Sequence, residues 1–386
     1  MKKKILFRIR SMQMGGVPKV LIDIVRNLDP EKFEPFIVTD LYQGELIDEI
    51  PGNIQVFSIS HGRQEMSSLF PIRLVQLALR NLKVSIYRLF PILYRRKIDI
   101  IPDIEVAILH SSLREMLKSP FKNSQKVCWF HTDVKWHHTI DEARKIARGM
   151  LSCDANVFVS KSTLETMEEL LQARIPNSHY IYNTFNAGEI LKKAAESLTS
   201  PLEKEIMARE NLMVSVGRLC HAKGYDMLIQ VHAELMNEGV FHHIAVVGDG
   251  TDFQKLQKMI RRLGVQDSFF LLGSRLNPYP YMLAAKCYIQ PSRYEAYPLA
   301  VGEALILNKP LISTMAGGIP ELIIHRKTGL LCQFNKNALK RTISEMLYNP
   351  RLRRDIRKHE REFDAEAHNK KIYCQINTLM EELLLR

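Results

Sequence analysis

The sequence predicts an α/β protein with two Rossmann-like lobes and a ligand cleft between them. The chain has 386 residues, more than one typical domain requires, so two domains are expected. Short apolar runs, such as KILF at 4–7 and LMVSVG at 212–217, alternate with helical patterns along the chain. Apolar strands alternating with helices are typical of parallel sheets covered on both faces. The pattern restarts after a polar helical stretch at 188–205, which divides the chain into lobes 1–187 and 188–363.

The expected strands of the first lobe are short, mostly apolar runs, as buried parallel strands are. They lie at 4–7, 33–40, 54–59, 104–110, 126–131, 155–160 and 179–182. Amphipathic patterns between them predict helices at 17–28, 141–151 and 162–172.

The second lobe repeats this alternation. Its expected strands lie at 212–217, 243–248, 268–273, 287–292, 310–314 and 329–334. A final helix at 364–386 follows a basic run and can pack back on the first lobe or on the second.

The composition limits the class of protein and its partners. A formal net charge of +12 indicates an anionic partner, which is a nucleic acid, a phosphate-bearing ligand or an anionic membrane. A basic surface that only keeps the protein soluble explains the same charge. Six cysteines form no CxxC pair, which favours reduced thiols and gives no zinc site. The first residues are too poor in apolar side chains for a signal peptide, and no run approaches a membrane span, so a cytoplasmic protein is expected.

Ligands of open α/β sheets bind where a strand ends and the next helix begins, so the strand-to-helix loops are the places to search. In the first lobe, Gly15 and Gly16 precede an amphipathic helix and can bring backbone N–H groups close to a phosphate, although a plain turn explains them equally. In the second lobe, a strand ends at Gly217 and delivers Arg218 and Lys223. Two cations there suit a diphosphate, whereas surface residues on a loop are the alternative.

Three further loops of the second lobe contain candidate residues. Gly248 and Gly250 mark a tight turn that is explained best as structural. Asn277 begins an NPYP loop that can offer groups to a nucleobase. Glu295 follows a strand and Glu303 lies in the next, apolar helix. Because an apolar helix rarely buries a carboxylate without a partner, Glu303 indicates a polar ligand such as a ribose diol.

Together these motifs resemble the retaining glycosyltransferases of family 4, which have the two-lobed GT-B fold. The resemblance depends on the pair Glu295 and Glu303, on SVGR…KG at 215–224, and on GGIPELI…TGLL at 317–331. The stretch that begins at Gly15 is similar to the opening lobe of the family. The similarity covers nearly the whole chain and is most specific in its second half.

The resemblance implies a role for each matching residue. Arg218 and Lys223 would hold the diphosphate of a nucleotide sugar, most often a UDP-sugar, and stabilise its departure. Glu303 would bind the ribose and Glu295 the donor sugar. Gly16, Gly248 and Asn277 would also line the donor site. His131 would contact the transferred sugar. The backbone of the segment that follows Glu295 would approach the phosphate or the sugar, and this segment consists of Ala296, Tyr297, Pro298 and Leu299.

The sequence departs from the family at one point. Ala296-Tyr297-Pro298 stands where the family usually has Gly-Phe-Gly, and proline removes one N–H that could contact a phosphate. The family binds no metal and needs no cofactor besides the donor. His137 and His138 are adjacent, but no cysteine or carboxylate set stands at ligand spacing, so no metal site is expected.

Residues 66–97 contain seven Lys or Arg and no acidic residue. Arg73, Arg80 and Arg88 recur at helical spacing among apolar side chains, with Pro71 and Pro91 as bounds. A basic amphipathic segment suits docking on anionic lipid. A helix packed on the first sheet with a solvated basic edge is the alternative.

The expected function is transfer of a hexose or N-acetylhexosamine to a saccharide acceptor, lipid-linked, with retention of configuration. Capsule, exopolysaccharide or lipopolysaccharide biosynthesis at the inner face of the cell membrane would use such an enzyme. Two alternatives remain: a GT-B relative acting as a nucleotide-sugar epimerase or phosphorylase, and a basic nucleic-acid-binding protein. Nucleic acid is not expected as a partner, because the sequence lacks a basic-aromatic platform and a helix-turn-helix pattern.

Overall fold

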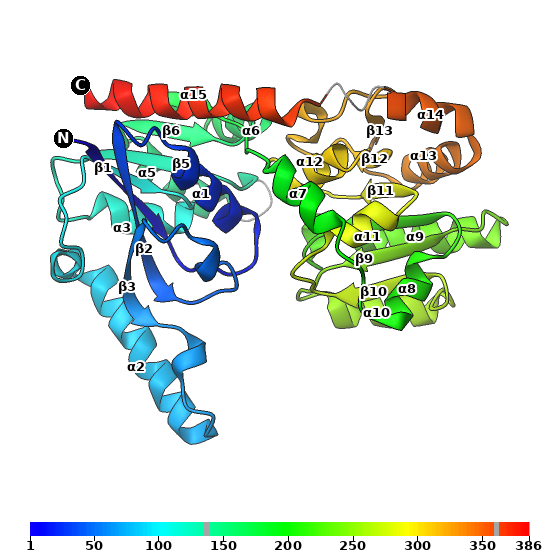
Figure 1. Ribbon diagram of the computed structural model, residues 1–386, viewed down its shortest axis with the longest axis horizontal. Helices are drawn as coiled ribbons and strands as arrows, with labels where there is room; N and C mark the ends of the chain where they lie inside the picture. Colours follow the sequence, from blue (N-terminus) through cyan, green and yellow to red (C-terminus); the bar gives the residue numbers. More distant parts are fainter. Residues whose placement is uncertain (135–138, 359–362, 386) are drawn as a thin grey trace. The chain divides into compact units, whose positions relative to one another are not determined.

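The computed structural model describes residues 1–134, 139–358 and 363–385 (Figure 1). His137 and His138 lie outside the described residues. The chain divides into two compact units, one of residues Met1–Thr184 with Lys370–Arg386 and one of residues Phe185–Asn369.

The first unit is built on a seven-stranded parallel sheet with the order β3-β2-β1-β4-β5-β6-β7. Its strands are β1 (Lys3–Ile9), β2 (Phe33–Tyr42), β3 (Gln55–His61), β4 (Ile104–Ala107), β5 (Gln125–Phe130), β6 (Ala155–Phe158) and β7 (Ser178–Tyr180). Ile5 of β1 lies opposite Pro35 of β2 and Ile104 of β4. Because β1 pairs with β2 on one side and β4 on the other, the strand order reverses at β1.

Helices connect these strands, and polar residues fix several of their ends. The α-helices are α1 (Gly16–Asn27), α2 (Phe70–Leu89), α3 (Leu113–Leu117), α5 (Ile140–Met150), α6 (Lys161–Leu171) and α15 (Ala365–Leu384), and the 3-10 turns are η1 (Ile47–Glu49), η2 (Arg63–Glu65), η3 (Pro91–Arg96) and η4 (His110–Ser112). Thr139 and Glu142 form a capping box at the start of α5. The C-terminal α15 packs on the first unit, where Tyr373 donates to Asp23 (2.7 Å) and Asn377 accepts from the Asp29 amide (3.0 Å).

The second unit has a six-stranded parallel sheet with the order β10-β9-β8-β11-β12-β13. Its strands are β8 (Leu212–Val216), β9 (His243–Val247), β10 (Phe269–Gly273), β11 (Cys287–Gln290), β12 (Leu311–Thr314) and β13 (Gly329–Cys332). The helices are α7 (Ala187–Ala194), α8 (Pro201–Met207), α9 (Tyr225–Asn237), α10 (Phe253–Arg262), α11 (Tyr279–Ala284), α12 (Leu299–Ile306), α13 (Lys336–Tyr348) and α14 (Pro350–Lys358), with 3-10 turns η5 (His221–Lys223) and η6 (Ile319–Glu321). Here the strand order reverses between β8 and β11.

The predicted fold class is confirmed, because both halves are parallel sheets joined by helices and every predicted apolar run contains a strand. The polar stretch at 188–205, however, is two helices rather than one. Pro201 stands in the first turn of α8 and Ser200 caps that helix. A proline has no amide proton to donate and restricts the residue before it, so a continuous helix through this point is disfavoured.

The basic segment 66–97 also differs from expectation. It forms α2 and η3, and Figure 1 shows α2 extending away from the sheet beside β3. Arg80 is only 8% exposed, and Arg88 pairs with Asp40 at 2.7 Å and with Glu115 at 3.2 Å. The expected basic stripe is therefore wrong for these two arginines, because both are engaged with the first unit. No described helix is long and apolar enough to cross a membrane.

Candidate active site

The loops after β8 and β11 meet at the point where the strand order of the second sheet reverses. The β8 loop contains Arg218 and the η5 turn, and the β11 loop contains Glu295. The carboxyl ends of parallel strands all lie at one edge of the sheet. Where the strand order reverses, the loops that follow the two neighbouring strands lead in opposite directions and leave a crevice between their starting points in such folds. Ligands of open α/β sheets bind at such a reversal of strand order.

Lys223 and Glu295 form an ion pair across these two loops. The Lys223 Nζ lies 2.6 Å from the Glu295 Oε1, and the two side chains are 21% and 8% exposed. Removing two charges from water is costly, so such a pair persists only when further hydrogen bonds support it. The structure therefore brings together two of the residues that the sequence singled out.

Two more side chains hold the same carboxylate oxygen. The Gln290 amide donates to Oε1 at 2.8 Å and the Ser292 hydroxyl donates to it at 2.6 Å. Gln290 in turn accepts from the Tyr288 hydroxyl at 2.6 Å. The second oxygen, Oε2, accepts no hydrogen bond from the described residues and is not fully buried. Glu295 is thus fixed through one oxygen and presents the other.

Two glycines allow the loops to approach this closely. Gly224 has φ +68°, and a Cβ there would lie 2.0 Å from the Pro291 carbonyl oxygen. Gly317 has φ +50°, and a Cβ there would lie 1.6 Å from the Glu295 carbonyl oxygen. Only glycine combines these backbone angles with such contacts. Both belong to motifs that the sequence showed, KG and GGIPELI, but their contacts depend on the tertiary structure.

Arg293 fastens the two loops from the other side. Its guanidinium binds Asp226 through two hydrogen bonds of 2.7 and 2.8 Å, and its backbone N–H donates to the Ala222 carbonyl at 2.7 Å. The Phe334 ring lies 4.7 Å from the guanidinium carbon. Burial opposes ionisation of Asp226, but the hydrogen bonds and charge of Arg293 lower its pKa. Sequence reasoning missed this pair.

Glu303 has a different environment from Glu295. It lies in α12, is 6% exposed, and its Oε1 accepts from the Tyr279 hydroxyl at 3.0 Å. The expected cost of burying this carboxylate is offset in part by that hydrogen bond. Tyr279 begins α11 in the NPYP loop, so the loop contributes a side chain to the glutamate.

The other predicted donor-site residues of this unit are engaged to different degrees. Arg218 is exposed, and its guanidinium forms no ion pair or hydrogen bond with the described residues. The Gly248 amide donates to the Gly273 carbonyl at 2.9 Å, and a Cβ on Gly248 would lie 2.0 Å from the Gly217 carbonyl oxygen. The Asn277 amide donates to the Lys193 carbonyl (2.7 Å) and to Glu196 (2.8 Å). Gly248 and Asn277 therefore have structural contacts, whereas Arg218 is free to bind a ligand.

The segment that departs from the family pattern leads into α12. Tyr297 is 5% exposed, and its ring centroid lies 6.4 Å from that of Phe185. Pro298 precedes the first helical residue, Leu299, and no side chain caps this end. The amides of Ala296 and Leu299 donate to no acceptor in the described part of the chain. Proline at this position removes one amide, but two others nearby stay available.

Gly16 and His131 belong to the first unit. Gly16 is the first residue of α1, and His131 directly follows β5. The His131 ring stacks on Trp129 with centroids 6.2 Å apart, and its Nε2 is buried without a hydrogen-bond partner among the described residues. Burial lowers the pKa of His131 to about 3, so the ring is neutral at pH 7.

Comparison with known proteins finds a family match in the second half of the chain. Residues 200–363 match the family model described as glycosyl transferases group 1. Those residues are similar to the group 1 glycosyltransferases and are called the group 1 domain below. The match contains Arg218, Lys223, Glu295 and Glu303, so the Lys223–Glu295 contact lies inside this domain.

Individual relatives and structures agree with the domain assignment. The chain is 25% identical over 240 residues to N-acetyl-alpha-D-glucosaminyl L-malate synthase of Bacillus anthracis, covering 61% of each chain. It is 26% identical over 197 residues to a Campylobacter jejuni N-acetylgalactosamine-N,N'-diacetylbacillosaminyl-diphospho-undecaprenol 4-alpha-N-acetylgalactosaminyltransferase, covering 50% of this chain and 51% of that one. The structure of Anabaena HepE in complex with UDP and glucose superposes with a TM-score of 0.72, 19% identity and 99% of both chains. The chain has the GT-B fold.

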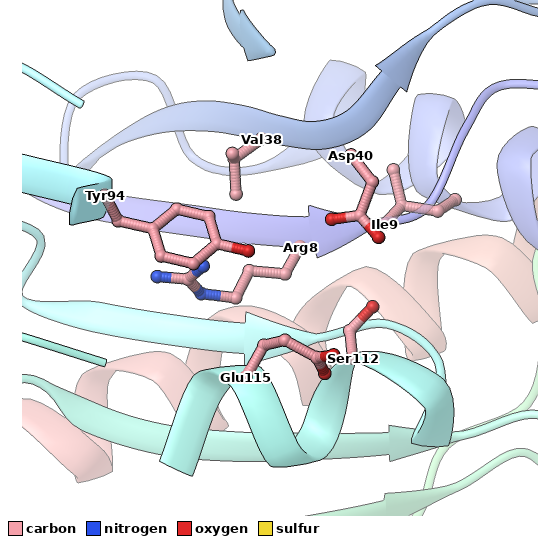
Figure 2. Close-up of a pocket in the computed structure, with 7 residues that line it drawn as sticks. All are labelled: Arg8, Ile9, Val38, Asp40, Tyr94, Ser112 and Glu115. Atoms are coloured by element: carbon pink, nitrogen blue, oxygen red, sulfur yellow. The ribbon is translucent and has the colours of Figure 1, made fainter. Parts of the chain in front are cut away.

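Figure 2 shows a second polar hollow, in the first unit, that the group 1 domain does not include. It is lined by Arg8, Ile9, Val38, Asp40, Tyr94, Ser112 and Glu115. Its free volume of about 10 Å³ has room for about one water molecule. Burial raises the pKa of Glu115, whose Oε2 has no hydrogen-bond partner among the described residues. The hollow is too small for a sugar ring.

The chemistry available to the group 1 domain follows from its free groups. The Lys223 ammonium has three N–H donors and uses one on Glu295. Arg218 adds a second cation without a partner. Together with the free Oε2 of Glu295, they can bind a ligand that combines phosphate oxygens with hydroxyl groups.

Proposed function

We propose that the protein is a retaining glycosyltransferase that moves a hexose or N-acetylhexosamine from a nucleotide sugar to a saccharide acceptor. The observation that carries this proposal is the Lys223–Glu295 contact of 2.6 Å at the reversal of strand order, beside the unpaired Arg218. A nucleotide sugar has a diphosphate for the cations and sugar hydroxyls for the carboxylate. The group 1 family match supports the same reading.

Each side chain then has a distinct role in the transfer. When the bond between the anomeric carbon and the diphosphate breaks, negative charge grows on the leaving oxygen. Arg218 and Lys223 stabilise that charge, which lowers the barrier. Glu295 is held rigidly through Oε1 and accepts a donor-sugar hydroxyl with Oε2. Glu303 binds the ribose, and Gly16 leaves room for the diphosphate at the start of α1.

Retention follows if the acceptor hydroxyl attacks the face from which the diphosphate leaves. The departing phosphate oxygen takes the acceptor proton in that route, so no side chain needs to act as a base. His131 is neutral because burial lowers its pKa to about 3, and it contacts the transferred sugar as a hydrogen-bonding group. A general base needs a pKa nearer to the working pH. Positive side chains take the place of a divalent cation in this scheme.

The relatives support a narrower choice of donor and acceptor. The HepE structures contain UDP or UDP-glucose, which favours a UDP-sugar as donor. The Campylobacter relative is named for a diphospho-undecaprenol-linked acceptor, which favours a lipid-linked saccharide. We infer a place in cell-surface polysaccharide biosynthesis, at the inner face of the cell membrane.

The test begins with donor binding and continues with transfer. Thermal shifts against UDP-, GDP- and ADP-sugars identify the donor, and transfer to lipid-linked and free saccharides is then measured with that donor. Lys223→Met should lower kcat/KM by about 100-fold, because one charge that stabilises the leaving group is lost. Lys340→Met is the matched control, since Lys340 is 24% exposed and also pairs with a glutamate, Glu238.

The outcomes separate the proposal from its alternatives. Retained anomeric configuration in the product and full activity in EDTA agree with it. Equal activity of the Lys223→Met and Lys340→Met variants would count against the site. Formation of a sugar 1-phosphate with inorganic phosphate as the acceptor would indicate a phosphorylase instead, and release of an epimerised sugar without any acceptor would indicate an epimerase.

A further inference from the structure

The exposed face of α2 is apolar over the length of the helix. Its six large side chains are spaced alternately by three and four residues and are between 38% and 67% exposed: Ile72, Val75, Leu79, Leu82, Ile86 and Leu89. Phe70 and Phe90, at the two ends, are 72% and 60% exposed. A contiguous apolar stripe of this length is rare on a free surface and marks an interaction site.

The opposite face of α2 holds the helix on the first unit. Val84 and Tyr87 pack against a buried apolar cluster, and the Tyr87 ring meets Tyr94 edge to face. Arg88 binds Asp40 and Glu115, and Arg80 is nearly buried. Over the C-terminal half of α2, the face that packs on the core is therefore already occupied, and the apolar stripe is a separate face of the helix.

The charged side chains of the segment that contains the stripe, residues 66–97, are all basic. Residues 66–97 contain no Asp or Glu. Arg73, Arg96 and Lys97 are exposed and form no ion pair with the described residues. An apolar face flanked by free cations complements a surface with an apolar interior and anionic head groups.

We propose that α2 docks the protein on an anionic lipid membrane, with the apolar stripe at the acyl boundary and the free cations at the lipid phosphates. This inference rests on the proposed function and names its partner: a lipid-linked acceptor is met at such a surface. This mode of docking differs from docking through a basic stripe. Arg80 and Arg88 already contact the first unit, so the apolar side chains, not these arginines, insert into the membrane.

A second copy of the chain is the competing occupant. Spacing by three and four residues is also that of a coiled-coil seam. In coiled coils, however, the positions beside the seam usually pair lysines with glutamates. Here those positions are Gln76, Lys83, Ala78 and Ser85, which offer no acid to the neighbouring cations. Charge complementarity thus favours the anionic membrane.

The experiment is vesicle co-sedimentation of the full chain, without sugars present. Vesicles contain phosphatidylcholine alone or phosphatidylcholine with phosphatidylglycerol. The Leu79→Gln/Leu82→Gln variant removes two side chains of the stripe that are 60% and 57% exposed; Leu151→Gln/Leu202→Gln removes leucines elsewhere that are 55% and 65% exposed. Arg96→Gln/Lys97→Gln tests the charges.

We expect binding to the anionic vesicles only, and weakened by salt. The stripe variant should lose about 100-fold or more in affinity, the charge variant about 25-fold, and the control variant little. Equal binding of stripe and control variants would overturn the inference. So would a vesicle-free dimer, seen by sedimentation velocity, that the stripe variant alone converts to a monomer.

Donor binding keeps this test separate from the proposed function. The stripe variant should still show the wild-type thermal shift with the donor sugar and transfer to a water-soluble acceptor. A protein that binds donor but no vesicles would overturn the docking alone. One that binds vesicles but no nucleotide sugar would overturn the proposed function and leave the docking surface in place.

Discussion

Two buried glutamates, one in each unit, solve the same physical problem in different ways. Glu105 of β4 is 0% exposed, and both of its oxygens are satisfied. Arg8 donates to Oε2 at 2.8 Å, and Ser124 donates to Oε1 at 2.9 Å together with Lys126 at 2.5 Å. Glu295, by contrast, receives three donors on Oε1 alone. The first cluster is closed, and the second leaves one oxygen unused.

We infer from this difference that the Glu105 cluster serves stability, and the proposed function assigns ligand binding to the Glu295 cluster. Burial opposes ionisation of Glu105, yet the charges of Arg8 and Lys126 lower its pKa, so it joins β1, β4 and β5 as a charged group. A closed cluster offers nothing to a ligand. The Glu295 cluster keeps a lysine whose side chain is 21% exposed and a free acceptor, and such incompletely satisfied polar groups are where a ligand gains the most.

The histidines repeat this contrast. His232 and His242 are both 0% exposed and form a closed chain, in which His232 Nδ1 lies 2.9 Å from His242 Nε2 and His232 Nε2 lies 2.8 Å from the Ser268 hydroxyl. His131 has a buried Nε2 without a partner among the described residues. The unpaired histidine is the one that follows a strand at the carboxyl edge of its sheet.

The strongest test of the comparison is the stability of Glu105→Gln. This change removes the negative charge and leaves Arg8 and Lys126 buried at 3% and 9% exposure. We expect a loss of about 3–5 kcal/mol, the usual cost of leaving a buried charge without its partner. Urea unfolding, followed through the fluorescence of the buried Trp129, measures it.

Glu295→Gln is the matched comparison. Its lysine partner can still reach water, so the expected loss is about 1 kcal/mol, whereas sugar transfer should be strongly reduced. The double variant Glu105→Gln/Lys126→Met should recover part of the stability, because it leaves one buried charge fewer. Equal destabilisation by the two single changes would contradict the distinction between closed and open clusters.

The local sequence pattern was sufficient to predict the fold and the strand ends at which the candidate site residues lie. Apolar runs such as 212–217 predicted strands because parallel sheets bury both faces of a strand. The rule that ligands bind at strand ends then pointed to Lys223 and Glu295, which the structure brings to 2.6 Å. Their roles, like that of Glu303, stay predictions.

What the sequence could not show depends on contacts between distant residues. Glu105 stands in the run IEVAILH and reads as an ordinary strand residue until β1 and β5 pack beside it. Arg293 and Asp226 are 67 positions apart, and no local pattern links them. The direction of the arginines on α2 was equally hidden, because helical spacing says which residues share a face but not which face is covered.

The closed histidine pair predicts a loss of stability in acid. Burial lowers the pKa of His232 to about 3 and that of His242 to about 4, both below the unfolded value of about 6.5. As the pH falls below about 6.5, the unfolded chain therefore takes up protons first. The stability contributed by the neutral pair is full above about pH 6.5 and declines toward pH 4, by up to about 1.4 kcal/mol per pH unit for each histidine.

Urea unfolding at a series of pH values from 7 to 4.5 measures that decline. His232→Gln/His242→Gln removes both titrating groups, so its stability should depend less steeply on pH even if it is lower throughout. His61→Gln is the control, because the His61 side chain is 75% exposed and should leave the profile unchanged. A double variant with the slope of the wild type would show that other groups cause the acid sensitivity.

The smallest expected effect concerns Arg293, which holds the open site without belonging to it. Arg293→Ala removes the two hydrogen bonds to Asp226 and the contact with Phe334. The loops that carry Lys223 and Glu295 are then no longer held at a fixed distance from each other. We expect kcat to fall about tenfold, which corresponds to about 1.4 kcal/mol in the activation free energy, with a smaller change in the donor KM.

Arg293→Lys should recover only part of the lost kcat, because an ammonium cannot bind a carboxylate through two parallel hydrogen bonds and stack on a ring. If Arg293→Ala lowered the melting temperature but left kcat unchanged where the variant is folded, the contact would be structural only. The open cluster would then hold its geometry through Gln290 and Ser292, whose hydrogen bonds to Glu295 do not involve Arg293.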